Sequence, residues 1–336
     1  MSQPGRGVGW KAMRVVSIDI VRAMAIVFVV VGHSLIFADR GGFIMGCIYS
    51  FHMPLMFVLS GFVAAASWER RAVPSGWRRA ASKVVRSARR LLVPYAVCGL
   101  VVVPVVNLLL THEFARSFAN GWRNAFLFNR FLWYLPCCFL LVSVFAAVTA
   151  AARGIRGARW FAGAAAAFAL LLLLWLLLPE VDYLRSAISY FASFFAGAWL
   201  WTRREVVLSP PRWLVAASAA ALAAFAVLHA ATPQMSILAK GAVKTAAGVA
   251  SLFPLMAVAN SMGGPLARAA AYVGRMTLFL YCFDFCATPV VVRYFTPDGT
   301  LLAFALAFGV VGLGVFVKLA WSYAIAPELG RMMKGA

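Results

Sequence analysis

Ten long apolar segments constrain the fold of this chain more than any other feature of its sequence. A helix needs about 20 predominantly apolar residues to cross a bilayer, and most of these segments have about that length. The segments lie at about residues 18–38, 43–66, 90–111, 131–152, 160–178, 184–201, 213–231, 238–259, 270–292 and 301–325. Only 12% of the residues are charged, whereas soluble domains have about 25%. We therefore expect an all-α polytopic membrane protein, built as a bundle of about ten transmembrane helices.

The Lys and Arg residues outside these segments are divided unequally between the two sides of the membrane. Ten spans place both termini on one side, and the loops and tails of that side hold 20 Lys and Arg against seven opposite. Because basic loops stay in the cytoplasm, we expect both termini there, in the plasma (inner) membrane of a bacterium. The net charge of +21 then indicates contact with anionic membrane lipids. Nucleic acid is excluded as a partner, because the basic residues lie in short loops and form no groove interleaved with aromatic residues.

No part of the sequence indicates a second domain or a bound metal. The longest loops, 67–89 and 112–130, are too short for a further domain, so residues 1–336 are expected to form one integral membrane domain without an appended soluble domain. All six cysteines lie in apolar segments and lack the spacing of zinc ligands, which is typical of small buried thiols. We expect no metal site and no permanently bound cofactor.

The first apolar segment carries three ionisable residues, Asp19, Arg22 and His33. Charged groups in hydrocarbon cost several kcal/mol, so each is a candidate functional residue. Asp19 and Arg22 are three residues apart and can pair along one helical face. His33 follows Arg22 by eleven residues, so the two side chains leave the helix in nearly the same direction, about 16 Å apart along its axis. This stripe predicts a polar cavity that extends from Arg22 to His33.

The second segment carries a further candidate histidine, His52, at a depth similar to that of His33. Pro54 follows two residues later and can kink the helix, which would open a space beside His52. Ser60 lies deeper, toward the cytoplasm. His52 is equally well interpreted as a structural residue, hydrogen-bonded to the backbone that the proline disturbs.

Motifs in five segments follow one another in an order that resembles one family of enzymes. The first two segments contain Asp19-x2-Arg22-x10-His33, Phe51-His52-Met53-Pro54 and Phe57-Val58-Leu59-Ser60-Gly61-Phe62. Weaker motifs follow at Arg89-Arg90-Leu91-Leu92-Val93-Pro94-Tyr95, Leu132-Trp133-Tyr134-Leu135 and Gly274-Arg275-Met276-Thr277-Leu278-Phe279-Leu280-Tyr281. Together they resemble the acyltransferase-3 superfamily of membrane O-acyltransferases, and the Phe-His-Met-Pro motif is most similar to its fucose-4-O-acetylase-like branch.

This resemblance implies a reaction and a role for each candidate residue. The co-substrate would be a cytoplasmic acyl-CoA, in the simplest case acetyl-CoA, and the acceptor a hydroxyl of an extracytoplasmic or lipid-linked glycan. Arg22, held by Asp19, would bind a phosphate or amide oxygen of the donor. His33 would be the general base. His52 would be a partner base, a proton relay or an acyl carrier.

The same resemblance extends the candidate binding residues to Ser60, Trp133, Arg275, Tyr281 and Asp284. Trp133 could stack on a sugar ring or belong to an interfacial aromatic belt. Asp284 stands where many relatives have a histidine.

Asp284 has several possible partners. It could form an ion pair with Arg275, Lys244 or Lys318, or it could orient His33 or His52.

Two other functions remain open from the sequence. The intramembrane ionisable residues could form the pathway of a proton-coupled small-molecule transporter. The chain could also acylate a small molecule at the cytoplasmic face. The position of His33 in the outer half of its segment disfavours this last reading.

Overall fold

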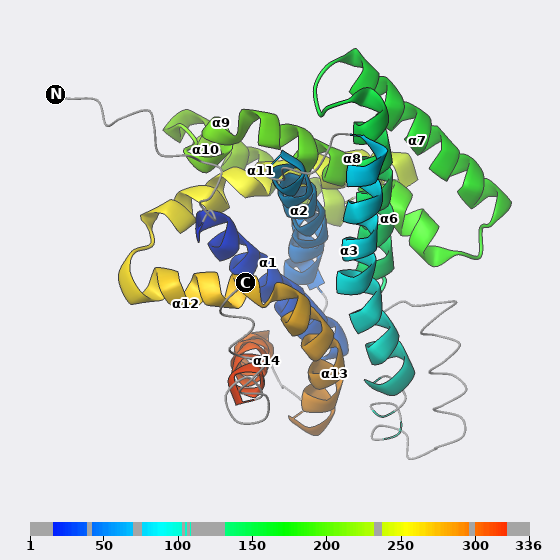
Figure 1. Cartoon of the computed structure of the whole chain (residues 1–336). Helices are drawn as coiled ribbons and strands as arrows, with labels where there is room; N and C mark the ends of the chain where they lie inside the picture. Colours follow the sequence, from blue (N-terminus) through cyan, green and yellow to red (C-terminus); the bar gives the residue numbers. More distant parts are fainter. Residues whose placement is uncertain are drawn as a thin grey trace.

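Every element in the described part of the chain is helical. The computed structural model describes residues 16–38, 42–69, 76–102, 105, 108, 132–231, 237–295 and 300–320. The helices are α1 (Val16–Phe37), α2 (Gly42–Glu69), α3 (Trp77–Val97), η1 (Cys98–Val102), α6 (Tyr134–Ala152), α7 (Ala158–Leu177), α8 (Asp182–Leu200), η2 (Trp201–Arg203), α9 (Arg204–Leu208), α10 (Arg212–Ala231), α11 (Ile237–Ser261), α12 (Gly264–Arg275), α13 (Thr277–Phe295) and α14 (Thr300–Ala320). Figure 1 shows their arrangement.

Seven of the described helices are long and apolar enough to cross a membrane. They are α1, α2, α6, α7, α13 and most of α11 and α14. Three expected spans fall short for different reasons. The helix α8 is more polar, and α10 has a shorter apolar part. The expected span 90–111 lies partly outside the described residues, and its first part forms the end of α3 and η1. The expected loop 112–130 lies outside the described residues. The chain is therefore an all-helical membrane protein, while the number of ten spans and the side of the termini stay predictions.

Two boundaries differ from those expected. Most of the expected 67–89 loop is helical, because α2 continues to Glu69 and α3 begins at Trp77. The expected span 270–292 is divided, because α12 ends at Arg275 and α13 begins at Thr277. Basic residues keep residues 77–89 out of a prediction based on apolar length, although helical periodicity can place such residues on one face of an amphipathic helix.

The helix α2 lies inside the bundle and packs against α1, α8, α10 and α11 (Figure 1). Its closest crossing is with α8, where a Cβ atom on Gly61 would overlap the carbonyl oxygen of Phe194. A Cβ atom on Gly197 would likewise overlap the carbonyl oxygen of Val58. Small residues allow this approach of two backbones, as is common between membrane helices. The crossing fixes the position of α2, which carries His52 and Ser60.

The helix α1 packs against α12, α13 and α14 as well as against α2. In Figure 1, α12 runs across the end of α1. A Cβ atom on Gly274 would overlap the carbonyl oxygen of Asp19, so the two backbones touch at this point. Together with α13, this packing fixes α1 and the residues on its polar face.

Candidate active site

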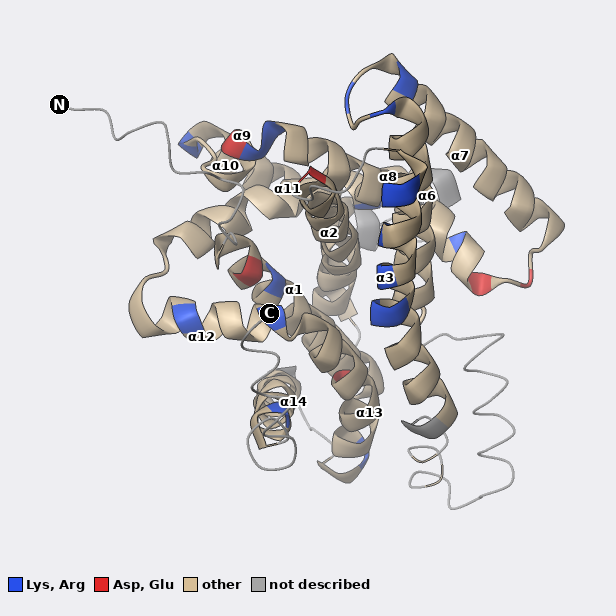
Figure 2. Ribbon diagram, viewed as in Figure 1, with Lys and Arg blue, Asp and Glu red and all other residues tan. Residues whose placement is uncertain are grey.

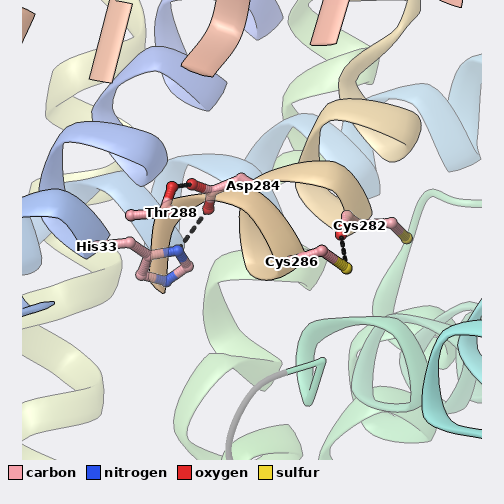
Figure 3. A network of polar contacts seen from close by, with 5 residues as sticks. All are labelled: His33, Cys282, Asp284, Cys286 and Thr288. Atoms are coloured by element: carbon pink, nitrogen blue, oxygen red, sulfur yellow. Dashed lines mark hydrogen bonds and ion pairs between the residues drawn. The ribbon is translucent and has the colours of Figure 1, made fainter. Parts of the chain in front are cut away.

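His33 and Asp284 form a partly buried pair between α1 and α13 (Figure 3). The Nδ1 atom of His33 donates to Oδ2 of Asp284 over 2.6 Å. The hydroxyl of Thr288 donates to the other carboxylate oxygen. The Asp284 side chain is 1% exposed, whereas that of His33 is 23% exposed. With its Nδ1 proton bound to Asp284, neutral His33 has Nε2 free to accept a proton.

This geometry selects one of the several partners that the sequence allowed for Asp284. The three cations considered as partners lie elsewhere: Arg275 stacks over Tyr272, Lys244 over Tyr190 and Lys318 over Phe279. Asp284 therefore orients His33, as a carboxylate orients the base of a catalytic triad.

Sequence reasoning missed Thr288. It follows Asp284 by four residues, and that spacing, which places both side chains on one helical face, is the signal that could have found it.

His52 is bound to its own helix. Its Nδ1 atom donates to the carbonyl oxygen of Ile48 over 2.7 Å, and its ring meets that of Tyr49 edge-on with centroids 4.6 Å apart. The Nε2 atom is buried and has no hydrogen-bond partner among the described residues. Gly248 of α11 packs directly against Pro54, and the His52 side chain, beside which a space was expected, is buried. The structural interpretation of His52 therefore accounts for these contacts better than the catalytic one.

A cavity of about 310 Å³ lies between α1, α2, α3, α6 and α13. Among the described residues, five cationic side chains and no carboxylate line it. These cations are Arg22, Arg79, Lys83, Arg86 and Arg90. Four of them come from α3, along which Figure 2 shows several basic residues. Such a cavity is suited to a polyanionic ligand.

The pair expected between Asp19 and Arg22 is present at the edge of this cavity. Their side chains are 3.5 Å apart, between Oδ1 of Asp19 and Nη1 of Arg22. Arg22 lines the cavity, and Asp19 is almost fully buried. Asp19 is therefore placed to hold Arg22, and it lies far along α1 from His33.

The inner end of the cavity is formed by hydroxyl-bearing side chains. The hydroxyls of Ser60 and Tyr134 are hydrogen-bonded over 2.7 Å, and the ring of Tyr134 meets that of Tyr281 edge-on at 5.5 Å. All three residues line the cavity. Tyr281 precedes Asp284 by three residues, so this end lies about one helical turn from the His33–Asp284 pair.

Of the polar cavity expected to extend from Arg22 to His33, this cavity includes only the Arg22 end, and the extension to His33 stays a prediction. Arg22 lines the cavity, but His33, His52 and Asp284 do not.

Two other predicted site residues lie outside the cavity. The ring of Trp133 stacks on Tyr190 with centroids 5.3 Å apart and packs beside Phe57, so it belongs to an internal aromatic cluster. Arg275 is the last residue of α12, and it is exposed. Among the described residues, no group of three His, Cys, Asp or Glu side chains is placed to hold a metal ion.

The fold and the site define a class: a helical membrane protein in which a histidine, oriented by an aspartate, lies near a basic cavity. The chain also matches the family model described as an acyltransferase domain over residues 15–325. It belongs to this acyltransferase-3 family and is a membrane acyltransferase. No curated protein and no solved structure matches it significantly. The resemblance to the fucose-4-O-acetylase-like branch stays a prediction.

Proposed function

We propose that this protein is an O-acyltransferase that moves an acyl group, in the simplest case acetyl, from cytoplasmic acyl-CoA to an extracytoplasmic or lipid-linked glycan. The observation that carries the proposal is the basic cavity, which ends about one helical turn from the His33–Asp284 pair. CoA is a polyanion with a long, thin arm that ends in the thioester. The positive charge of the cavity complements the phosphates of CoA. The thioester-bearing arm would extend past the inner end of the cavity toward His33.

The direction of transfer follows from the charge distribution. The side of the membrane with the excess of Lys and Arg is the cytoplasmic side under the positive-inside rule. The basic face of α3 lines the cavity, which favours a donor that binds from the cytoplasm. His33 lies near the opposite end of α1. A glycan hydroxyl arriving from outside would give its proton to Nε2 of His33.

Two observations favour this function over a proton-coupled transporter. The ionisable residues form two separate pairs, Asp19 with Arg22 and His33 with Asp284, instead of one continuous pathway. The family is one of acyltransferases. CoA would act as a co-substrate, and the protein would lie in a bacterial inner membrane with both termini in the cytoplasm.

The Arg22→Lys variant tests the donor site. Lysine keeps the charge but loses the planar guanidinium, which can form two parallel hydrogen bonds to a phosphate. We expect acetyl-CoA to bind about tenfold more weakly, since a hydrogen bond to a charged group contributes about 1.5–3 kcal/mol. Binding is measured as the rise in melting temperature of purified protein during titration with acetyl-CoA.

The matched control is Arg212→Lys, because Arg212 is exposed and does not line the cavity. This variant should respond to acetyl-CoA as the wild type does. If Arg22→Lys also responds like the wild type, Arg22 serves only to partner Asp19, and the donor site is elsewhere.

A further inference from the structure

The ring of Tyr49 on α2 lies against the residue that precedes His33. That residue is Gly32, and a Cβ atom there would lie 3.0 Å from Cε2 of Tyr49. The aromatic ring therefore occupies space that is available only because residue 32 has no side chain. This contact places Tyr49 and His33 at the same depth in the bundle.

The Tyr49 ring packs between Gly32 of α1 and a histidine of its own helix. On one side the ring meets the edge of His52, with centroids 4.6 Å apart. The ring contacts Gly32, the chain neighbour of the histidine that Asp284 orients. Its side chain is partly exposed, and no described residue is hydrogen-bonded to its hydroxyl. The hydroxyl proton is therefore available to a ligand that contacts His33.

Acyl transfer needs such a donor close to the base. When a hydroxyl attacks a thioester, negative charge develops on the carbonyl oxygen, and hydrogen-bond donors that face this oxygen lower the barrier. The buried carboxylate of Asp284 would repel that charge. A neutral donor beside His33 would offset this repulsion.

Other polar groups of α2 are less suited to this role. His52 uses its Nδ1 proton on Ile48, so neutral His52 has no proton on Nε2 to donate. The hydroxyl of Ser60 is paired with Tyr134 at the cavity, about two helical turns beyond His52.

We propose that Tyr49 is a catalytic residue that donates its hydroxyl hydrogen bond to the thioester carbonyl oxygen of the acyl donor. This inference rests on the proposed acyl-CoA-dependent function. The acceptor oxygen forms a bond to the carbonyl carbon while its proton passes to Nε2 of His33, and the carbonyl π electrons move to the oxygen that Tyr49 holds. The intermediate collapses by breaking the C–S bond. The CoA thiolate then takes the proton from His33.

The Tyr49→Phe variant tests this role, because it removes only the hydroxyl. We expect kcat for release of the CoA thiol from acetyl-CoA to fall by about 10²- to 10³-fold, the usual effect of removing one such donor. The KM for acetyl-CoA and the thermal stabilisation by acetyl-CoA should be unchanged, since the basic cavity is intact. As a control, Tyr183→Phe removes the hydroxyl of an exposed tyrosine at the start of α8 and should keep full activity.

The Gly32→Ala variant gives a second and independent measurement. The added methyl group pushes the Tyr49 ring away from the pair, so kcat should fall in the wild-type background. In the Tyr49→Phe background the same methyl group should cause little additional loss, because the two changes act through one hydroxyl.

The outcomes separate this inference from the proposed function. If wild-type protein neither binds acetyl-CoA nor releases its thiol with any acceptor, the proposed function fails, and the role of Tyr49 fails with it. If the wild type is active and Tyr49→Phe has a kcat within about threefold of it, the donor role of Tyr49 alone is overturned. A fall in donor binding with unchanged kcat would also overturn that role.

Discussion

Replacing His33 with alanine is expected to lower acyl transfer by about 10²- to 10⁴-fold, the range contributed by a positioned general base. His33 is the partly exposed member of the pair, and its Nδ1 proton is held by Asp284. Its Nε2 atom is therefore the basic atom that an acceptor hydroxyl can reach. The measurement is the rate of CoA thiol release from acetyl-CoA by purified protein, with and without candidate glycans.

The binding of the donor supplies the control for this variant. The cavity is lined by Arg22 and the basic residues of α3 and not by His33, so acetyl-CoA should stabilise His33→Ala against heat as it does the wild type. A well-folded His33→Ala protein that transfers acyl groups at the wild-type rate would contradict the assignment of the base.

The Asp284→Asn variant is expected to lose about 10²-fold or more in rate. An amide of the same shape cannot stabilise the imidazolium that forms when His33 takes a proton, and it can hold the ring in the wrong tautomer. Thr288 would still donate to the remaining oxygen, so the helix packing should persist. Rates and melting temperatures are measured as for His33→Ala.

The double variant His33→Ala/Asp284→Asn shows whether the two residues act as a unit. Its activity should be close to that of His33→Ala alone, because Asp284 acts only through His33. If the two losses multiply, or if Asp284→Asn is fully active, the carboxylate has a different role.

The contacts that could be predicted from the sequence are the local ones. The pair between Asp19 and Arg22 follows from their spacing on one helix, and both residues lie where that spacing places them. The bond between His33 and Asp284 joins residues 251 positions apart. The sequence allowed five partners for Asp284, and only the packing of α13 against α1 selects among them.

The basic helix α3 shows why the candidate site was only partly predictable. Apolar length identifies spans, but the first part of α3, residues 77–89, is rich in Arg and Lys and falls in the loop expected at 67–89. Once helical, its cationic side chains line the cavity beside Arg22. Three residues at the inner end of the cavity, Ser60, Tyr134 and Tyr281, come from three different helices. No periodicity along a single helix predicts that Tyr134 and Tyr281 meet.

An assay in sealed vesicles tests whether the acyl group crosses the membrane through this protein. Vesicles are prepared with the protein in a single orientation, acetyl-CoA labelled in its acetyl group is sealed on the side of the basic loops, and impermeant oligosaccharides are added outside. We expect labelled acetyl esters on the outer oligosaccharide, and none when acetyl-CoA is supplied only from outside. If both substrates react only on the side of the basic loops, transfer across the membrane is wrong, and the protein acylates its acceptor at the cytoplasmic face.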